Sequence, residues 1–371
     1  MASAHAVVSL PRAYSSPGFY VANASASPWP KMKAGIWEPY TFELLDCLLS
    51  NHTNAIFVDV GAFVGPLSLY AASLNATVFA AEADVDNFAS LLANVAANPL
   101  SLRRRLSTHL LAIAKESGIA VMSKPARDED IALEHRLTEQ DPSAVSIMES
   151  VRNSGHADDF SADPLLKREE WTVPTMGLHT YLQHILSVAS GGPTAKHRLV
   201  LSMDIEGAEI DALQAAFPLL SSMDPVERPP LILEMHPGFF ALEGGSRARY
   251  VASTSRVLSL YSGLYFLGRD DKPRCQPGAE KAEHCHWPAV LAKFTSVHHL
   301  ASFMTDTTQE AFMLHASNDP ALARSSIIQV KMSGDNLAHH RREDALEDIL
   351  TSHYGLNALA LAGVTLEASG L

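Results

Sequence analysis

The stretch from Phe57 to Gly65, read F-V-D-V-G-A-F-V-G, restricts the fold more than any other part of the chain. Its apolar run is typical of a buried strand, and the glycine turn that follows is typical of the start of a helix. The next apolar run, 77–81, ends at Glu82. A strand, a glycine turn, a helix and a second strand ending in a carboxylate build the nucleoside pocket of doubly wound α/β sheets. The glycine lets backbone approach the ligand, and the carboxylate accepts hydrogen bonds from ribose hydroxyls.

The glycines of this turn discriminate between nucleoside cofactors. A dinucleotide-binding turn has three, G-x-G-x-x-G, with a pyrophosphate on the helix N-terminus. Here only Gly61 and Gly65 occur, and Asp59 stands just before them. A carboxylate there repels a pyrophosphate and attracts a cation. The turn therefore favours S-adenosylmethionine (SAM), with its ammonium and sulfonium groups, over the cofactor of an NAD-dependent or nucleotide-sugar oxidoreductase. An ordinary buried strand and turn without a ligand is the plain alternative.

Three further segments extend the pattern. Residues 82–94 read E-A-D-x-x-N-F-x-x-L-x-x-N, residues 199–209 read L-V-L-S-M-D-I-E-G-A-E, and residues 231–236 read L-I-L-E-M-H. Together with V-D-V-G-A-x-x-G at 58–65, these blocks resemble the FkbM family of SAM-dependent methyltransferases over roughly residues 36–317. The resemblance implies an α/β, Rossmann-like class I methyltransferase fold with a seven-stranded, mostly parallel sheet flanked by helices. It also implies O-methylation of a hydroxyl on a sugar or another small metabolite.

The chain departs from the family pattern at four positions. Phe63 replaces an asparagine, Pro66 an aromatic residue, and Ala83 a proline, while Ser202 replaces a lysine two places before the motif aspartate. Proline is tolerated in the first turn of a helix. Ser202 bears more on function because alternation along a strand puts it on the same face as Asp204. The departures Phe63 and Ser202 favour the alternative function, a non-catalytic methyltransferase-fold protein that serves as a binding or scaffold module.

Ligands of open α/β sheets bind outside the carboxyl ends of the strands. The resemblance implies which of these ends binds which part of the cofactor. Asp59 and the glycine turn would hold the methionine part, and Glu82 the ribose. Asp204 and Glu206 would face the sulfonium or the acceptor. The full expected cofactor-binding set is Asp59, Gly61, Ala62, Gly65, Glu82, Asn87, Asp204 and Glu206.

Methyl transfer to a hydroxyl requires alignment of the reacting atoms and a general base. The candidate catalytic residues are Asp204, Glu234 and His236. Histidine titrates near neutral pH, and Glu234 shares its strand face, so the acid could orient the imidazole. Alternatively, His236 merely caps the strand end. No metal ion is expected, although Asp204, Glu206 and Glu234 offer the oxygen ligands that Mg²⁺ prefers. Glu209 is expected to stabilise the start of a helix.

The resemblance implies one Rossmann-like domain at residues 36–317, after an N-terminal extension at 1–35. Strands are expected near 55–60, 77–82, 108–114, 198–204, 230–235, 263–268 and 310–316, the last of them antiparallel. Gly118 is expected to turn a hairpin from the third strand into 119–122. A charged insertion spans 124–170 and is a candidate lid. Residues 318–371 form a C-terminal extension, with an amphipathic helix expected at 338–351.

The net charge of −13 and the pI near 5.7 argue against a nucleic-acid partner, since phosphate contacts require clustered Lys and Arg. The basic run 103–105 is interpreted as a solvated surface loop. No apolar run approaches the ~20 residues that span a bilayer. The expected partner is a small-molecule or glycan acceptor.

Localisation and cysteine chemistry stay open in the sequence. The cytoplasm is the default compartment, with an organelle or a secretory lumen as alternatives, because the N-terminal segment matches no targeting signal clearly. Cys47 is expected to be a small core residue. Cys275 and Cys285 are compatible with either a disulfide or two free thiols, and the run 284–286 lacks the spacing of a structural zinc site.

Overall fold

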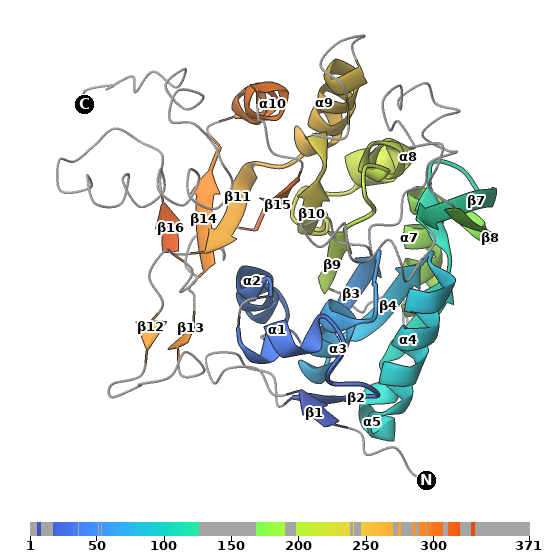
Figure 1. Cartoon of the computed structure of the whole chain (residues 1–371). Helices are drawn as coiled ribbons and strands as arrows, with labels where there is room; N and C mark the ends of the chain where they lie inside the picture. The colour runs from blue at the N-terminus through green and yellow to red at the C-terminus, as the bar shows by residue number, and fades with distance from the viewer. Residues whose placement is uncertain are drawn as a thin grey trace.

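The computed structural model of the protein is an α/β structure built on one large twisted sheet (Figure 1). It describes residues 6–8, 18–35, 37–50, 52, 54–125, 168–189, 198–237, 240, 246–269, 274–275, 285–286, 289–294, 296–306, 311–319 and 328–330. The predicted helix at 338–351 and most of the insertion at 124–170 lie outside these residues.

The large sheet contains nine strands in the described part of the chain. Their order is β16 (Ile328–Val330), β14 (Ala289–Lys293), β11 (Gly263–Arg269), β15 (Phe312–Ser317), β10 (Leu231–Met235), β9 (Arg198–Met203), β3 (Ala55–Val60), β4 (Thr77–Glu82) and β5 (Leu106–Leu110). From β5 to β11 these are the seven predicted strands, with β15 antiparallel to both neighbours as expected. This order is the Rossmann-like arrangement of the class I methyltransferase fold, and β14 and β16 extend it at the β11 edge.

Helices cover both faces of the sheet, which explains why its central strands are almost wholly apolar. All six residues of β3 are buried, and alternate ones enter different cores. Ile56, Val58 and Val60 belong to the core under α7 (Leu178–Ala189), α8 (Glu209–Ser222), α9 (Ser246–Leu258) and α10 (Val297–Asp306). Ala55 and Phe57 belong to the core under α2 (Pro39–Leu49), α3 (Pro66–Ser73) and α4 (Val85–Ala96).

The hairpin predicted at Gly118 is wrong, because its strands belong to a second, three-stranded sheet in which they are not neighbours. The strands of this sheet are β6 (Ala112–Ala114), β8 (Arg168–Gly177) and β7 (Gly118–Pro125), in that order. The turn before Gly118 does reverse the chain, but β6 and β7 do not pair with each other. Instead β8, which follows the insertion, lies between them, parallel to β6 and antiparallel to β7. The predicted third strand is also divided, since β5 belongs to the large sheet and β6 to the small one.

The remaining short elements lie at the periphery. Arg103 ends a short helix, α5 (Leu100–Arg103), where a loop was expected.

Cys47 is partly buried in α2 and is a free thiol. In the two-stranded ladder of β12 (Arg274–Cys275) and β13 (Cys285–His286), Cys275 and Cys285 are register partners. Across the described residues, no helix is both long and apolar enough to cross a membrane.

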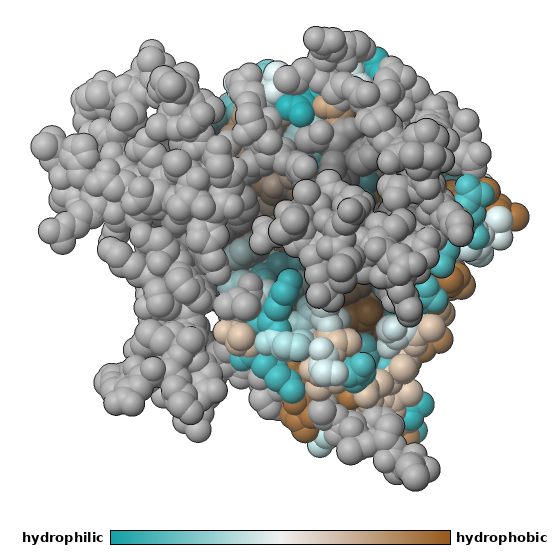
Figure 2. Space-filling model, viewed as in Figure 1, coloured by the Kyte–Doolittle hydropathy of each residue, from teal (hydrophilic) through white to brown (hydrophobic). Residues whose placement is uncertain are grey.

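On the face drawn in Figure 2, hydrophobic surface occurs as separate brown areas among hydrophilic ones, near β1–β2 and α5 and at the tips of β7 and β8. Large apolar side chains that are exposed in these elements include Val7, Leu100 and Ile119.

The N-terminal segment is attached to α4 and to the turn that follows it by two asparagine side chains, Asn94 in the helix and Asn98 just after it. It contains β1 (Ala6–Val8), β2 (Phe19–Val21) and α1 (Trp29–Lys33). The Asn98 side chain accepts from the Tyr20 N–H at 2.8 Å and donates to the Tyr20 carbonyl at 2.8 Å. The Asn94 Oδ1 accepts from the Ala22 N–H at 2.9 Å, and its Nδ2 donates to the Val64 carbonyl at 2.9 Å. Asn94 thus links the N-terminal segment to the glycine turn.

Replacing Asn98 with alanine should destabilise the protein, because Tyr20 loses the partners of both its backbone groups. The expected loss in the free energy of unfolding is about 1–3 kcal/mol, measured by urea denaturation. Ser101→Ala, at an exposed position, is the control and should change little. Equal stability of Asn98→Ala and the control would show that this attachment contributes nothing.

Candidate functional site

A cavity of about 350 Å³ opens at the carboxyl ends of β3, β4, β9 and β10. Six carboxylates line it, and no Lys, Arg or His side chain is among the described lining residues. These acids are Glu38, Asp59, Glu82, Asp204, Glu206 and Glu234. Apolar walls come from several elements, including Met122 of β7 and Met313 of β15. Such a concentration of acidic groups attracts a cation and disfavours an anion.

The glycine turn after β3 has the backbone conformation that the sequence predicted. Gly61 and Gly65 have φ angles of +82° and +94°, which L side chains rarely adopt. A Cβ on Gly61 would lie 1.7 Å from the Asp204 carbonyl oxygen, and one on Gly65 would lie 2.5 Å from Leu91 Cδ1. Gly65 is the N-cap of α3, and Pro66 opens that helix. The φ angle therefore favours glycine at both positions, and the backbone contact at Gly61 excludes any side chain there.

Asp59 is almost fully buried at the end of β3, with 3% of its surface exposed. It accepts a hydrogen bond of 2.5 Å from the Ser68 hydroxyl of α3. Burial raises its pKa to about 7, an effect that the Ser68 hydrogen bond opposes. A buried carboxylate with such a pKa gains from a cationic partner, because the cation offsets the cost of ionisation.

Glu82 organises the turn in addition to lining the cavity. Its Oε2 accepts from the Phe63 N–H at 2.7 Å, and its Oε1 accepts from the Asp84 N–H at 2.7 Å. Burial raises the pKa of Glu82 to about 7 against these two hydrogen bonds. Each carboxylate oxygen can accept a second hydrogen bond, so a ribose hydroxyl still has acceptors here. Asp84 in turn caps α4 by accepting from the N–H groups of Asp86 and Asn87.

The D-I-E-G-A-E block forms a tight turn between β9 and α8. The Asp204 N–H donates to the Val60 carbonyl at 2.9 Å, which ties this turn to the end of β3. Glu206 and Gly207 both have positive φ angles, of 51° and 95°. Asp204 and Glu206 line the cavity, and so does Ser202, which is on the predicted face.

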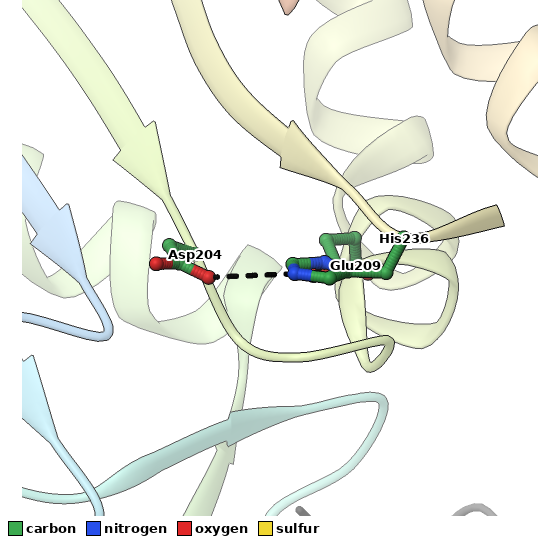
Figure 3. A group of neighbouring side chains, drawn as sticks. All are labelled: Asp204, Glu209 and His236. Carbon is green, nitrogen blue, oxygen red and sulfur yellow. Dashed lines mark hydrogen bonds and ion pairs between the residues drawn. The ribbon is translucent and has the colours of Figure 1, made fainter. Parts of the chain in front are cut away.

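His236 is buried between acids behind the cavity wall, with 2% of its surface exposed. Its Nδ1 lies 2.8 Å from Glu209 Oε1, and its Nε2 lies 3.9 Å from Asp204 Oδ1 (Figure 3). Glu206 Oε2 lies 3.4 Å from the same Nε2. Burial alone would lower the pKa of His236, but Glu209 and the neighbouring acids raise it to about 10. The imidazole is thus a cation at neutral pH and cannot accept a proton there.

Glu209 has a larger role than the helix-start function predicted for it. It opens α8 as expected, and its Oε1 accepts from the Gly207 N–H at 3.0 Å. The same oxygen binds His236, so Glu209 is the acid that orients the imidazole, in place of Glu234. Glu234 instead shares a hydrogen bond with Asp204, which requires a proton on one of the two carboxyls. Burial raises the pKa of both groups.

Glu38 is a cavity residue that the sequence interpretation missed. It precedes α2 with a left-handed φ of 39° and lines the cavity beside Trp37. Burial and the negative charge of Asp204 raise its pKa to about 8. The only signal for it in the sequence is the Glu-Pro pair at the start of a helix, which marks a helix start and nothing more.

The structure brings most of the predicted site residues together around the cavity, where they remain candidates. The ones that line it are Asp59, Gly61, Ala62, Glu82, Asn87, Asp204, Glu206 and Glu234. Gly65 and His236 do not line it, since one caps α3 and the other lies behind the wall.

No family model matches the chain, and no curated protein matches it. Among solved structures, the chain is similar to precorrin-6y C5,15-methyltransferase from Geobacter metallireducens. The two sequences are 9% identical, the match covers 74% of this chain and 84% of that chain, and the TM-score is 0.28. The chain is also similar to the glycopeptide N-methyltransferase MtfA in complexes with SAM and with sinefungin. Both MtfA structures show 7% identity and a TM-score of 0.24, with 72% and 73% of this chain and 82% of theirs covered. These TM-scores are low, and the fold is assigned from the order of the strands in the large sheet.

The raised pKa of Asp59 predicts a pH dependence of stability that Asp59→Asn removes. Between pH 5 and pH 7 the folded protein holds a proton on Asp59 that the unfolded chain has lost, so stability falls as pH rises and levels off above the folded pKa. With a folded pKa of about 7, this group accounts for a fall of about 2 kcal/mol. Urea denaturation at several pH values should show that the free energy of unfolding declines less steeply with pH in Asp59→Asn than in the wild type. Glu227→Gln, at an exposed position, should keep the wild-type slope, and identical slopes for all three proteins would contradict the assignment.

Proposed function

We propose that the protein is a SAM-dependent methyltransferase of the FkbM type that methylates a hydroxyl on a sugar or another small metabolite. The observation that carries the proposal is the anionic cavity around the two-glycine turn, at the edge of the sheet where α/β proteins bind nucleosides. SAM carries two positive charges, and Asp59 and Glu82 lie at the two strand ends that would meet its amino-acid and ribose parts.

In this proposal each part of the cofactor has a chemical partner. The ammonium group of SAM lies near Asp59, which becomes a full carboxylate when the cation arrives. The ribose hydroxyls donate to Glu82. The sulfonium faces the end of β9, where Asp204 and Glu206 line the cavity. The acceptor occupies the remaining space beside Glu234 and Glu38.

Methyl transfer then proceeds as an in-line displacement. The acceptor oxygen forms a bond to the methyl carbon as the carbon–sulfur bond breaks, and S-adenosylhomocysteine leaves as a neutral thioether. The hydroxyl proton passes to the Asp204–Glu234 pair, two hydrogen-bonded carboxyls whose pKa values burial raises. His236 as an imidazolium holds the acidic turn in place and does not act as the base.

The proposal is tested by incubating the protein with SAM labelled with tritium in the methyl group and a panel of neutral sugars, polyols, amines and carboxylic acids. We expect label in a hydroxyl compound. Asp204→Asn should lower kcat by about 10²-fold or more because it removes a general base. Its rate should also lose the rise with pH that accompanies ionisation of the pair, and Glu227→Gln should behave as wild type.

Two outcomes would contradict the proposed reaction in different ways. Transfer to amines alone would make the protein an N-methyltransferase. Tight binding of SAM without transfer to any compound class would favour the alternative, a methyltransferase-fold binding or scaffold protein.

A further inference from the structure

Ser202 places a buried hydroxyl against the cavity. It lies near the end of β9, with 4% of its surface exposed. Its neighbours Leu201 and Met203 belong to the core under α7, α8, α9 and α10, so strand alternation turns Ser202 to the opposite side, where it lines the cavity. Its hydroxyl makes no hydrogen bond to any residue that the structure describes. Buried polar groups in proteins nearly always have a partner, so Ser202 points to a ligand in the cavity.

Four carboxyl groups lie near this hydroxyl. Asp59 is the register partner of Ser202 on β3, and Asp204 follows Ser202 by two residues on the same face. Glu234 of β10 and Glu38, the residue before α2, complete the group. Burial raises the pKa of Glu38, Asp59 and Glu234, and the negative charge of Asp204 raises each of them further. The four groups are therefore close enough to act on one ligand electrostatically.

In the proposed function, SAM offsets only part of this negative charge. Its ammonium group lies near Asp59 and its sulfonium near Asp204, but its own carboxylate cancels one of the two positive charges. No Lys, Arg or His side chain is among the described lining residues, so the protein supplies no cation to Glu38 inside the cavity. An acceptor that fills the remaining space is favoured if it brings a positive charge of its own.

The residue before Glu38 suits this corner of the cavity to an ammonium group. Trp37 also lines the cavity, and its ring packs against that of Phe42 in α2, with centroids 5.8 Å apart. Ammonium groups are attracted to aromatic rings, most strongly to tryptophan, as well as to carboxylates. An ammonium group gains from both Trp37 and Glu38, whereas a neutral group gains from neither charge interaction.

We propose that Trp37, Glu38 and Ser202 select the acceptor, and that this acceptor carries an ammonium group in addition to the hydroxyl that receives the methyl group. Amino sugars, aminocyclitols and amino alcohols have this chemistry. The ammonium group lies against Glu38 and Trp37, another hydroxyl of the acceptor bonds to Ser202, and the methylated hydroxyl faces the Asp204–Glu234 pair. This acceptor class rests on the proposed function and narrows it.

The test compares matched hydroxyl compounds that differ in one ammonium group: glucosamine with glucose, inosamine with inositol, and ethanolamine with ethylene glycol. Each compound is titrated calorimetrically into the full chain, alone and with S-adenosylhomocysteine present, and is then offered as acceptor with tritium-labelled SAM. We expect the ammonium member of at least one pair to bind about tenfold or more tightly than its neutral partner, the lower end for a hydrogen bond to a charged group. We also expect this compound to carry the label on oxygen.

Variants separate charge recognition from a structural role. Glu38→Gln should remove the preference for the ammonium member while the affinities for the neutral member and for SAM stay near those of the wild type. Trp37→Leu should reduce the preference in part. Ser202→Ala should weaken both members of a pair equally, because its hydroxyl bonds to an uncharged part of the acceptor. Glu227→Gln, at an exposed position, is the control and should keep the wild-type preference.

The comparison on the wild-type protein decides the matter even if a variant does not fold. Equal binding of both members in every pair, or binding of none, would overturn the proposed acceptor class. Label on nitrogen would overturn it too, because the amine would then lie at the reacting methyl group. Equal methylation of neutral compounds would leave the proposed function standing without this acceptor class. If the chain binds the ammonium compounds but neither SAM nor S-adenosylhomocysteine, the proposed function fails and the ammonium subsite stands.

Discussion

The contact between Gly61 and the backbone of Asp204 is the constraint on which the site depends. The glycine turn after β3 and the acidic turn after β9 approach so closely that even a methyl group at Gly61 would overlap the Asp204 carbonyl oxygen. The Asp204 N–H donates to the Val60 carbonyl beside it. Neighbouring parallel strands bring their carboxyl ends to one edge, and this contact fixes the two turns that follow them at that edge. The distance between Asp59 and the acids of the second turn is set here.

The second feature is the concentration of negative charge that the fold stabilises. Four of the six acids are held by specific hydrogen bonds. Asp59 accepts from the Ser68 hydroxyl, Glu82 accepts from two backbone N–H groups, and Asp204 and Glu234 are hydrogen-bonded to each other. These hydrogen bonds only partly offset the cost of burying carboxylates, as their raised pKa values indicate. The cavity thus has a negative potential that a cationic ligand would offset.

Much of this arrangement could be predicted from the sequence because its determinants are local. The strand at 55–60, its glycine turn and the acid ending the next strand lie within 30 residues, and each follows from apolar runs and glycine. The family resemblance carried by the four ordered blocks likewise predicted a seven-stranded, mostly parallel sheet. The hairpin at Gly118 was wrong because β8, more than 40 residues further along the chain, displaces one strand of the pair. No local pattern can reveal such a long-range partner.

The functional site was also predicted only in part, where local sequence determines the position of a residue. Strand alternation placed Ser202 and Asp204 on one face, and both line the cavity. The partner of His236 was misjudged because Glu234 is near in sequence, whereas Glu209 reaches the imidazole from the next layer of the fold. Glu38 was missed for a related reason, since nothing in its own segment indicates that α2 starts beside β9. Contacts between elements decide these roles, and they depend on packing.

The most direct test of the account is calorimetric titration of SAM into the wild-type protein and Asp59→Asn, at pH 8. Micromolar binding to wild type, about −8 kcal/mol, weakened at least tenfold by the substitution, is the result that the anionic cavity predicts. Absence of SAM binding to the folded wild-type protein, or equal affinity in Asp59→Asn, would contradict the central claim that this cavity holds a cationic nucleoside.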